Sequence, residues 1–226
     1  MIQSSPEADE FKERLRKSLR LQVRNSRAVK ILKHTNVYSC GDQEEMVYFV
    51  EDGQVKLVML STEGKECMLA IHASGDVFGE LSLSGRSGRQ ETATAMEDTL
   101  LKKVPSAAFL EQLSRDSLLE GFVKYLAVRV ADQQAVIANL VTVDSEQRLG
   151  KTLLQLARQL GKKGPRSTRI ELKISHEELS YMIGTTRPRI SVFMQRFRHL
   201  DLLEVSEDHY LIIREDKLAA YLASIA

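Results

Sequence analysis

The sequence has no tryptophan, only two cysteines and no long apolar run. Two thiols, Cys40 and Cys67, are too few for a disulfide framework or for the four thiolates that hold a typical iron–sulfur cluster. No segment approaches the roughly 18 consecutive apolar residues that a transmembrane helix needs. A disulfide scaffold, a cluster protein and a helical membrane protein are therefore not predicted.

The N-terminus and the histidines exclude further classes of protein. The first residues, MIQSSPEADEF, are acidic and lack the apolar core and cleavage site of a secretory signal, so we expect a cytoplasmic protein. The five histidines have no metal-ligand spacing and no adjacent nucleophile or base, which predicts neither a metal site nor an enzyme. They are His34, His72, His176, His199 and His209.

Length and charge indicate two domains of different electrostatic character. A chain of 226 residues is long enough for two modest domains. From Ser145 onward there are 14 Lys and Arg against 10 Asp and Glu, whereas the first 144 residues hold 18 basic and 21 acidic residues. Four arginines near the C-terminus share one short stretch without an acidic residue, as a phosphate-facing helix requires. They are Arg187, Arg189, Arg196 and Arg198.

The first half of the chain has the pattern of an antiparallel β-sandwich or jelly-roll barrel. Residues 9–23 place Phe11, Leu15 and Leu19 on one stripe of a short helix. Short β-rich runs separated by turn signals then follow, with no helical pattern between them. These runs are 47–50, 55–60, 67–71, 92–96 and 100–104. Pro105 is placed to open a helix, where its missing N–H costs nothing.

Residues 117–143 predict a long helix that pairs with its own copy. Seven positions alternate at spacings of four and three, which is the seam of a coiled coil. They are Leu119, Val123, Leu126, Val130, Gln133, Ile137 and Leu140. Gln133 is the polar member of the seam: it either sets the register of the pair or contacts a ligand across it.

A second helix follows a break at Asp144, which forms a D-x-x-Q capping box with Gln147. Residues 161–165 predict a loop and residues 169–174 a strand. The next segment, SHEELSYMIGTTRPRISVFMQRFRHL, predicts two helices joined by a tight turn. Features of the first helix are a Ser175 and Glu178 capping box, a buried stripe and Gly184 as its terminator. That stripe comprises Leu179, Met182 and Ile183.

The second of these helices has a face suited to DNA. We expect Thr186 to cap it, Pro188 to sit in its first turn, and Ile190, Phe193 and Phe197 to be buried. The residues left outward are Arg187, Arg189, Ser191, Val192 and Gln195.

Each outward side chain suits a particular contact. An arginine in the major groove can bind guanine O6 and N7 as a fork, so Arg187 is predicted to read a base. Ser191 and Val192 can contact a base edge and a thymine methyl, whereas Arg189, Thr186 and His176 are placed for phosphates. The alternative is a helical hairpin with a solvated basic face. A predicted hairpin at residues 203–213, with Glu207 and Asp208 in its turn, favours a winged helix-turn-helix over that alternative.

With these motifs in place, the chain resembles the cyclic-AMP receptor/FNR (Crp/Fnr) family of bacterial transcription regulators over about residues 30–215. The resemblance rests on VYFVEDGQVKL, GKECMLAIHASGDVFGELSL, the ANLVTVD hinge and IGTTRPRIS. It implies an α+β chain with a cyclic-nucleotide-binding-like jelly-roll barrel, a long dimerisation helix and a winged helix-turn-helix. It also implies a homodimer on a pseudo-palindromic double-stranded DNA site, reoriented about the hinge by an effector, with RNA polymerase as a partner of an activator.

The resemblance also suggests an effector site. Gly79, Glu80 and Arg89 match the residues that hold the cyclic phosphate and ribose of nucleotide-binding members, with Leu81 beside them. If Thr92 is instead the hydroxyl of that motif, Glu91 takes the place of the arginine and puts a like charge beside the phosphate. Gln133 or Gln134 can offer a purine both a donor and an acceptor. Cyclic AMP or cyclic GMP is one candidate effector; a non-nucleotide effector, or none, is the other.

These expectations divide the chain into four parts. They are an N-terminal helical extension (1–25), a sensor domain (26–115), the dimerisation helix (116–144) and the DNA-binding domain (145–226). A protein-interaction module without DNA function is the competing class of function.

Overall fold

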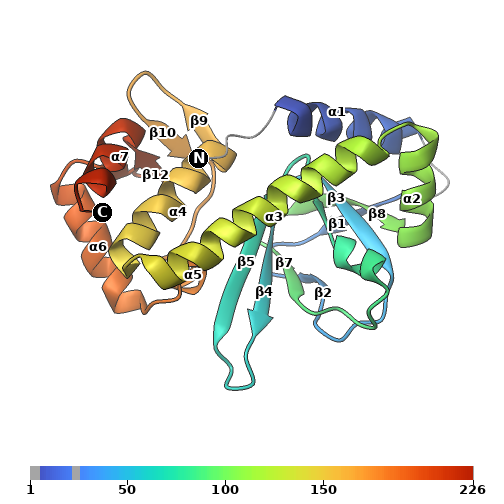
Figure 1. The fold of residues 1–226 in the computed structure, drawn as a ribbon, viewed down its shortest axis with the longest axis horizontal. Helices are drawn as coiled ribbons and strands as arrows, with labels where there is room; N and C mark the ends of the chain where they lie inside the picture. The colour runs from blue at the N-terminus through green and yellow to red at the C-terminus, as the bar shows by residue number, and fades with distance from the viewer. Residues whose placement is uncertain (1–5, 22–25, 226) are drawn as a thin grey trace. The chain divides into compact units, whose positions relative to one another are not determined.

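The computed structural model describes residues 6–21 and 26–225. Its contacts divide the chain into two compact units, and the division falls inside a long helix, between Val130 and Ala131. The first unit holds the β-sheets of the N-terminal half, and the second holds the small helical domain of the C-terminal half (Figure 1).

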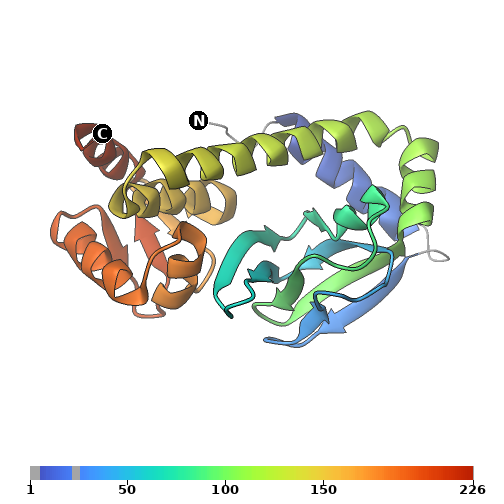
Figure 2. The same cartoon turned by 60° about the horizontal axis from the view of Figure 1, so that its bottom comes forward.

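The first unit contains two four-stranded antiparallel sheets (Figure 2). One has the order β1-β8-β3-β6 and the other the order β2-β7-β4-β5. Their bounds are β1 (Arg27–Ile31), β2 (Asn36–Tyr38), β3 (Met46–Asp52), β4 (Gln54–Leu60), β5 (Glu66–Ala73), β6 (Val77–Phe78), β7 (Thr92–Ala95) and β8 (Thr99–Pro105). The predicted antiparallel β-domain is confirmed, with every expected strand present. β1 was not predicted because most of its side chains are exposed, so it lacks the alternation of a half-buried strand.

Three helices complete this unit. They are α1 (Pro6–Leu21), α2 (Ser106–Arg115) and the first half of α3 (Leu119–Thr142). Phe11, Leu15 and Leu19 are buried on α1 as predicted, and α1 contacts the first half of α3 through Phe11 (Figure 1). The ring centroids of Phe11 and Phe122 are 5.9 Å apart, and a Cβ on Gly121 would come within 2.9 Å of Phe11. The close approach of the two helices therefore requires glycine at position 121.

Pro105 precedes α2 rather than opening it, since it is the N-cap residue of a helix that begins at Ser106. The seam of α3 faces outward in the single chain: Leu119, Val123, Val130, Ile137 and Leu140 are between 45% and 62% exposed. Leu126 is half-buried.

In its described residues, the second unit holds the end of α3, four further helices and a small sheet of order β11-β12-β10-β9. Its elements after α3 are α4 (Ser145–Leu160), β9 (Gly161–Lys163), β10 (Thr168–Ile170), α5 (His176–Ile183), α6 (Arg187–His199), β11 (Leu203–Val205), β12 (Leu211–Ile213) and α7 (Glu215–Ser224). The core is built from Leu149, Leu153, Ile170, Ile190 and Phe197, all fully buried.

Two local predictions need correction here. Residues 161–163 form a strand rather than a loop because they pair in antiparallel register with Thr168–Ile170, and β10 ends at Ile170 rather than at 174. Only half of the Asp144 capping box exists. The Asp144 carboxylate accepts from the Gln147 backbone N–H at 2.8 Å, but the Gln147 side chain does not accept from the Asp144 backbone N–H, and its amide donates to the Ile225 carbonyl.

Candidate nucleic-acid interface and effector site

α5 and α6 pack against each other and against α4 as a helix-turn-helix (Figure 2). The predicted capping box starts α5: Ser175 Oγ accepts from the Glu178 backbone N–H, and the Glu178 carboxylate accepts from the Ser175 backbone N–H. Gly184 ends the helix with φ of 64°, the left-handed conformation that glycine adopts most readily. This turn sets the direction in which α6 leaves.

The buried stripe of α6 differs slightly from the predicted one. Ile190, Met194 and Phe197 are buried, whereas Phe193 is only half-buried, because the helix turns its 190, 194 and 197 positions toward the core. Thr186 occupies the N-cap position but its side chain makes no capping hydrogen bond, so the predicted cap is wrong in that respect. Pro188 lies in the first turn as expected. Met182 on α5 is half-buried rather than buried.

The five residues predicted to face outward on α6 are all exposed: Arg187, Arg189, Ser191, Val192 and Gln195. Among the described residues, no carboxylate forms an ion pair with Arg187 or Arg189. His176 on α5 reaches the same face, with its Nδ1 2.9 Å from the Ser191 hydroxyl. Partial burial, and then the charge of Arg187, lower the pKa of His176. The imidazole is therefore neutral near pH 7 and is within hydrogen-bond distance of the Ser191 hydroxyl.

One arginine of the basic stretch has a structural role instead. Arg196 Nη1 lies 2.6 Å from Glu146 Oε2, and the Tyr221 hydroxyl donates to the other oxygen of Glu146 at 2.7 Å. These contacts join α6, α4 and α7. Of the four arginines in the stretch, Arg196 is therefore already paired with a half-buried acid on another helix, and its charge is only partly available for phosphate.

The predicted wing is present as the β11–β12 hairpin, with exposed Glu207 and Asp208 in its turn. Where the turn meets β12, the guanidinium of Arg169 and the ammonium of Lys173 lie 4.7 Å and 5.1 Å from the Tyr210 ring centroid. These cations therefore lie close to an acidic turn and form cation–π contacts with its last residue.

The predicted effector residues of the first unit lie around a short helical turn, η1 (Glu80–Ser84). Gly79 precedes it with φ of 75°, and a Cβ there would come within 3.0 Å of the Met46 carbonyl. Glu80 Oε1 pairs with Arg129 Nη2 at 3.1 Å, and Arg129 Nη1 donates to the Val77 carbonyl at 3.1 Å. The turn is thereby tied to α3 through a residue that is not part of its seam.

Arg129 was missed by the sequence analysis, although a signal for it exists. Phe122, Tyr125 and Arg129 follow one another at helical spacing on a stripe distinct from the seam, and the first two are buried against the first unit. The Tyr125 hydroxyl also contacts the backbone of Val77. α3 therefore has two separate contact stripes. One packs against the rest of the first unit, and the other is the exposed seam.

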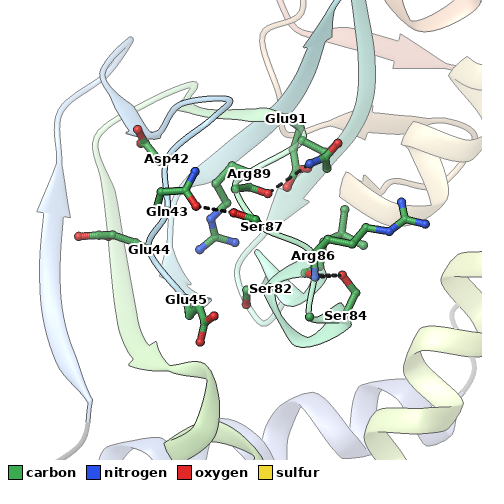
Figure 3. A pocket seen from close by; sticks show the side chains of 14 residues that line it. Asp42, Gln43, Glu44, Glu45, Ser82, Ser84, Arg86, Ser87, Arg89 and Glu91 are labelled. Atoms are coloured by element: carbon green, nitrogen blue, oxygen red, sulfur yellow. Dashed lines mark hydrogen bonds between the residues drawn. The ribbon is translucent and has the colours of Figure 1, made fainter.

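Arg89 is buried (Figure 3); its Nη1 and Nη2 are engaged, whereas its Nε has no hydrogen-bond partner among the described residues. It donates to the Gly79 carbonyl at 2.8 Å and to the Met46 carbonyl at 2.5 Å, and its guanidinium carbon lies 4.2 Å from the Tyr38 ring centroid. Glu91, at 1% exposure, accepts from the Tyr38 hydroxyl at 2.8 Å. Thr92 accepts from the Cys40 backbone N–H at 3.1 Å. An incoming phosphate would have to compete with backbone carbonyls for Arg89.

Gln133 and Gln134 are exposed on the part of α3 that belongs to the second unit, and the exposed Leu81 lies on η1. Both cysteines are free and exposed. Within the described residues there is no cluster of three metal-ligating side chains, and no helix is long and apolar enough to cross a membrane.

Comparisons with known proteins agree with this architecture. Residues 28–116 match the cyclic nucleotide-binding domain model and residues 147–221 match the Crp-like helix-turn-helix domain model. The global nitrogen regulator of Synechococcus elongatus is 31% identical over 75% of this chain and 78% of its own length. The CRP-like cAMP-activated global transcriptional regulator of Mycobacterium tuberculosis is 26% identical over 82% and 83%.

The solved structures include a CooA mutant from Carboxydothermus hydrogenoformans. It is 27% identical, covers 87% of this chain and 88% of its own, and superimposes with a TM-score of 0.73. Two family models matched in order, and a relative above 30% identity along most of both chains, identify the protein: it belongs to the Crp/Fnr family of helix-turn-helix transcription regulators.

Proposed function

We propose that the protein binds a pseudo-palindromic DNA site as a homodimer and places α6 of each protomer in the major groove. The observation that carries this proposal is the outward face of α6, where two arginines that pair with no acid of the described residues stand beside exposed Ser191, Val192 and Gln195. A helix N-terminus in the major groove presents such side chains to base edges. In this proposal residues 26–115 sense, 116–144 dimerise and 145–226 bind DNA.

The side chains of this face have different roles in the proposal. Arg187 reads a guanine as a bidentate fork, and Ser191, Val192 and Gln195 contact neighbouring base edges. Arg189 binds phosphate, as do Thr186 and His176. The hydrogen bond between His176 and Ser191 supports a further role for the imidazole, which holds the serine hydroxyl in place.

The homodimer is supported by the exposed seam of α3. Five of its apolar side chains are about half-exposed in the single chain, and a contiguous apolar stripe of that kind is costly in water. Pairing in parallel would bury the stripe and place two copies of α6 about one DNA turn apart, roughly 34 Å.

The effector acts, in this proposal, at Gly79, Glu80 and Leu81. A ligand that binds Glu80 competes with Arg129 for the same carboxylate, and so acts directly on α3. Arg89, Thr92, Gln133 and Gln134 are the other proposed contacts. Cyclic AMP and cyclic GMP remain candidates, as does a non-nucleotide effector or none, and an activator would also contact RNA polymerase.

The test is selection of bound duplexes from a random-sequence pool, followed by gel shifts on the selected site. A two-fold-symmetric sequence should emerge, and Arg187→Ala should lose its preference for that sequence over random duplex. Arg166→Ala is the matched control, since Arg166 is also exposed but lies on the β9–β10 hairpin. Recovery of no sequence preference, or equal effects of the two substitutions, would contradict the proposal.

A further inference from the structure

The two helices of the helix-turn-helix are joined by a hydrogen bond between side chains on their outward face. His176, the first residue of α5, has its Nδ1 2.9 Å from the hydroxyl of Ser191 on α6. Ser191 is exposed and His176 is half-buried, so the hydroxyl is accessible to a ligand. Whatever contacts the Ser191 hydroxyl therefore meets a group that is already hydrogen-bonded to His176.

The hydroxyl of Ser191 has a single hydrogen, and two acceptors within the protein compete for it. One is Nδ1 of His176, and the other is the carbonyl of Arg187, at 3.2 Å and one turn earlier on α6. Nδ1 accepts only when it carries no proton, and the Ser191 oxygen then has only lone pairs left for a third group. When Nδ1 is protonated it becomes a donor, and the Ser191 hydrogen is free to point elsewhere. The proton on the imidazole therefore decides what Ser191 can offer to a ligand.

The surroundings of His176 keep a single proton on its ring. Partial burial, and then the charge of Arg187, lower its pKa, so near pH 7 one ring nitrogen is a donor and the other an acceptor. The neighbouring acids on α5 do not reverse this, because Glu177 accepts from a tyrosine hydroxyl and Glu178 is bonded to the N-cap residue. Arg148 of α4 donates to the carbonyl at the opposite end of α5.

The partner of Nε2 determines which of the two nitrogens carries that proton. Among the described residues, no hydrogen bond engages Nε2 of His176. On bound DNA, a phosphate oxygen at this place can only accept, so it would hold the proton on Nε2 and leave Nδ1 as an acceptor. The Ser191 hydrogen would then point to Nδ1, and the Ser191 oxygen would present only lone pairs to the base edge.

We propose that His176 makes Ser191 an acceptor-only reader of DNA, so that Ser191 selects an adenine or a cytosine over a guanine or a thymine. In the major groove adenine and cytosine present an amino group, whereas guanine and thymine present a carbonyl oxygen. An oxygen without a hydrogen to give binds the amino group, and against a carbonyl it leaves two acceptors facing each other. The inference rests on the proposed DNA-binding function and makes His176 a positioning residue for base specificity, in addition to its phosphate contact.

The experiment measures base preference with the full chain on the selected DNA site. Ser191→Ala identifies the base position that Ser191 reads, as the position at which preference is lost. Wild type should prefer adenine or cytosine there by about fivefold, the effect of one hydrogen bond. His176→Lys keeps a donor and a positive charge for phosphate but offers Ser191 no acceptor. It should keep the affinity for random duplex and bring the preference at this position close to parity.

Further variants separate this effect from a loss of folding. His176→Leu removes both ring nitrogens and should also lose the preference, whereas His199→Lys, at an exposed histidine in the last turn of α6, should keep it. In a Ser191→Ala background, His176→Lys should have no further effect at this position, as expected for two coupled residues.

A guanine or thymine at the Ser191 position, or a preference that survives both His176 variants, would overturn the inference while leaving the DNA-binding function in place. A wild-type selection without any sequence preference would refute the proposed function itself, and this inference with it. The two failures are therefore distinguishable.

Discussion

The substitution Ile137→Ala tests the dimer seam, and its effect can be worked out from exposure. Ile137 is 62% exposed in the single chain, and full burial of an isoleucine side chain is worth about 1.5 to 3 kcal/mol. Burying the exposed part is then worth about 1 to 2 kcal/mol per protomer, and the residue occurs twice in a symmetric dimer. Since alanine keeps part of that burial, we expect a loss of about 2 to 3 kcal/mol, a 30- to 160-fold rise in the dimer dissociation constant.

Sedimentation velocity over a range of concentrations measures that constant. Leu32→Ala is the matched control, because Leu32 is 61% exposed, like Ile137, but lies between β1 and β2 rather than on α3. It should not change the dissociation constant. A wild-type protein that is monomeric at micromolar concentration, or equal constants for the two variants, would refute the role assigned to the seam.

Three further outcomes are expected. Arg187→Ala should lower the binding free energy on the selected site by about 1 to 3 kcal/mol and relax the preference at one base position. Arg189→Ala should weaken binding to all duplexes alike and flatten the salt dependence, as measured by gel shifts at several salt concentrations. Equal losses on selected and random duplex for both variants would contradict this division of roles. Glu207→Gln with Asp208→Asn should tighten binding or leave it unchanged, and weaker binding would show that the acidic wing tip makes a favourable contact. Burial lowers the pKa of His72 from 6.5 to about 4. The unfolded chain therefore takes up a proton at this residue before the folded chain does, so the free energy of unfolding is undiminished above pH 6.5 and falls as the pH drops toward 4. Urea unfolding at pH 7.5 and 4.5 should therefore show about 2 to 3 kcal/mol more acid destabilisation in wild type than in His72→Phe, and equal losses would mean that His72 is charged when folded.

The parts of the fold that could be predicted from the sequence are those in which the local pattern agrees with the tertiary structure. Five strands could be predicted because each is a β-rich run next to turn residues: β3, β4, β5, β7 and β8. The capping box of α5 could be predicted because it needs only two residues three positions apart. β1 could not be read in this way, since its partner β8 rather than its own pattern makes it a strand.

The site residues show the same difference between features set by the local sequence and features set by distant contacts. The outward face of α6 follows from helical periodicity alone, which is why all five predicted side chains are exposed. The engagement of Arg196 by Glu146, of Glu80 by Arg129 and of Arg89 by two backbone carbonyls depends on groups that are distant in the sequence. Helical periodicity predicts which face of the helix a side chain lies on, but not which residue distant in the sequence forms an ion pair or hydrogen bond with it.

The corner between α3 and α4 bears on how an effector signal travels. The family resemblance places the hinge at the ANLVTVD segment, residues 138–144. Arg148 donates to the Val143 carbonyl at 2.7 Å and to the Ile183 carbonyl at 2.9 Å, and Lys151 donates to Asn139 Oδ1 at 2.8 Å. The last turn of α3 is thereby tied to α4 and to the end of α5.

Opening this corner at Asp144 would cost the two hydrogen bonds that cross it, from Arg148 to the Val143 carbonyl and from Lys151 to Asn139, whereas the bond from Arg148 to Ile183 lies within the C-terminal domain. Each is a bond from a charged donor, worth about 1.5 to 3 kcal/mol, so the motion would lose about 3 to 6 kcal/mol unless new partners formed. A rearrangement of α3 upstream of Asn139 keeps both bonds. The corner therefore favours a switch in which the end of α3 moves with the helix-turn-helix as one body. Repacking of the seam around Ile137 would then reach α6 through this corner rather than be absorbed at Asp144.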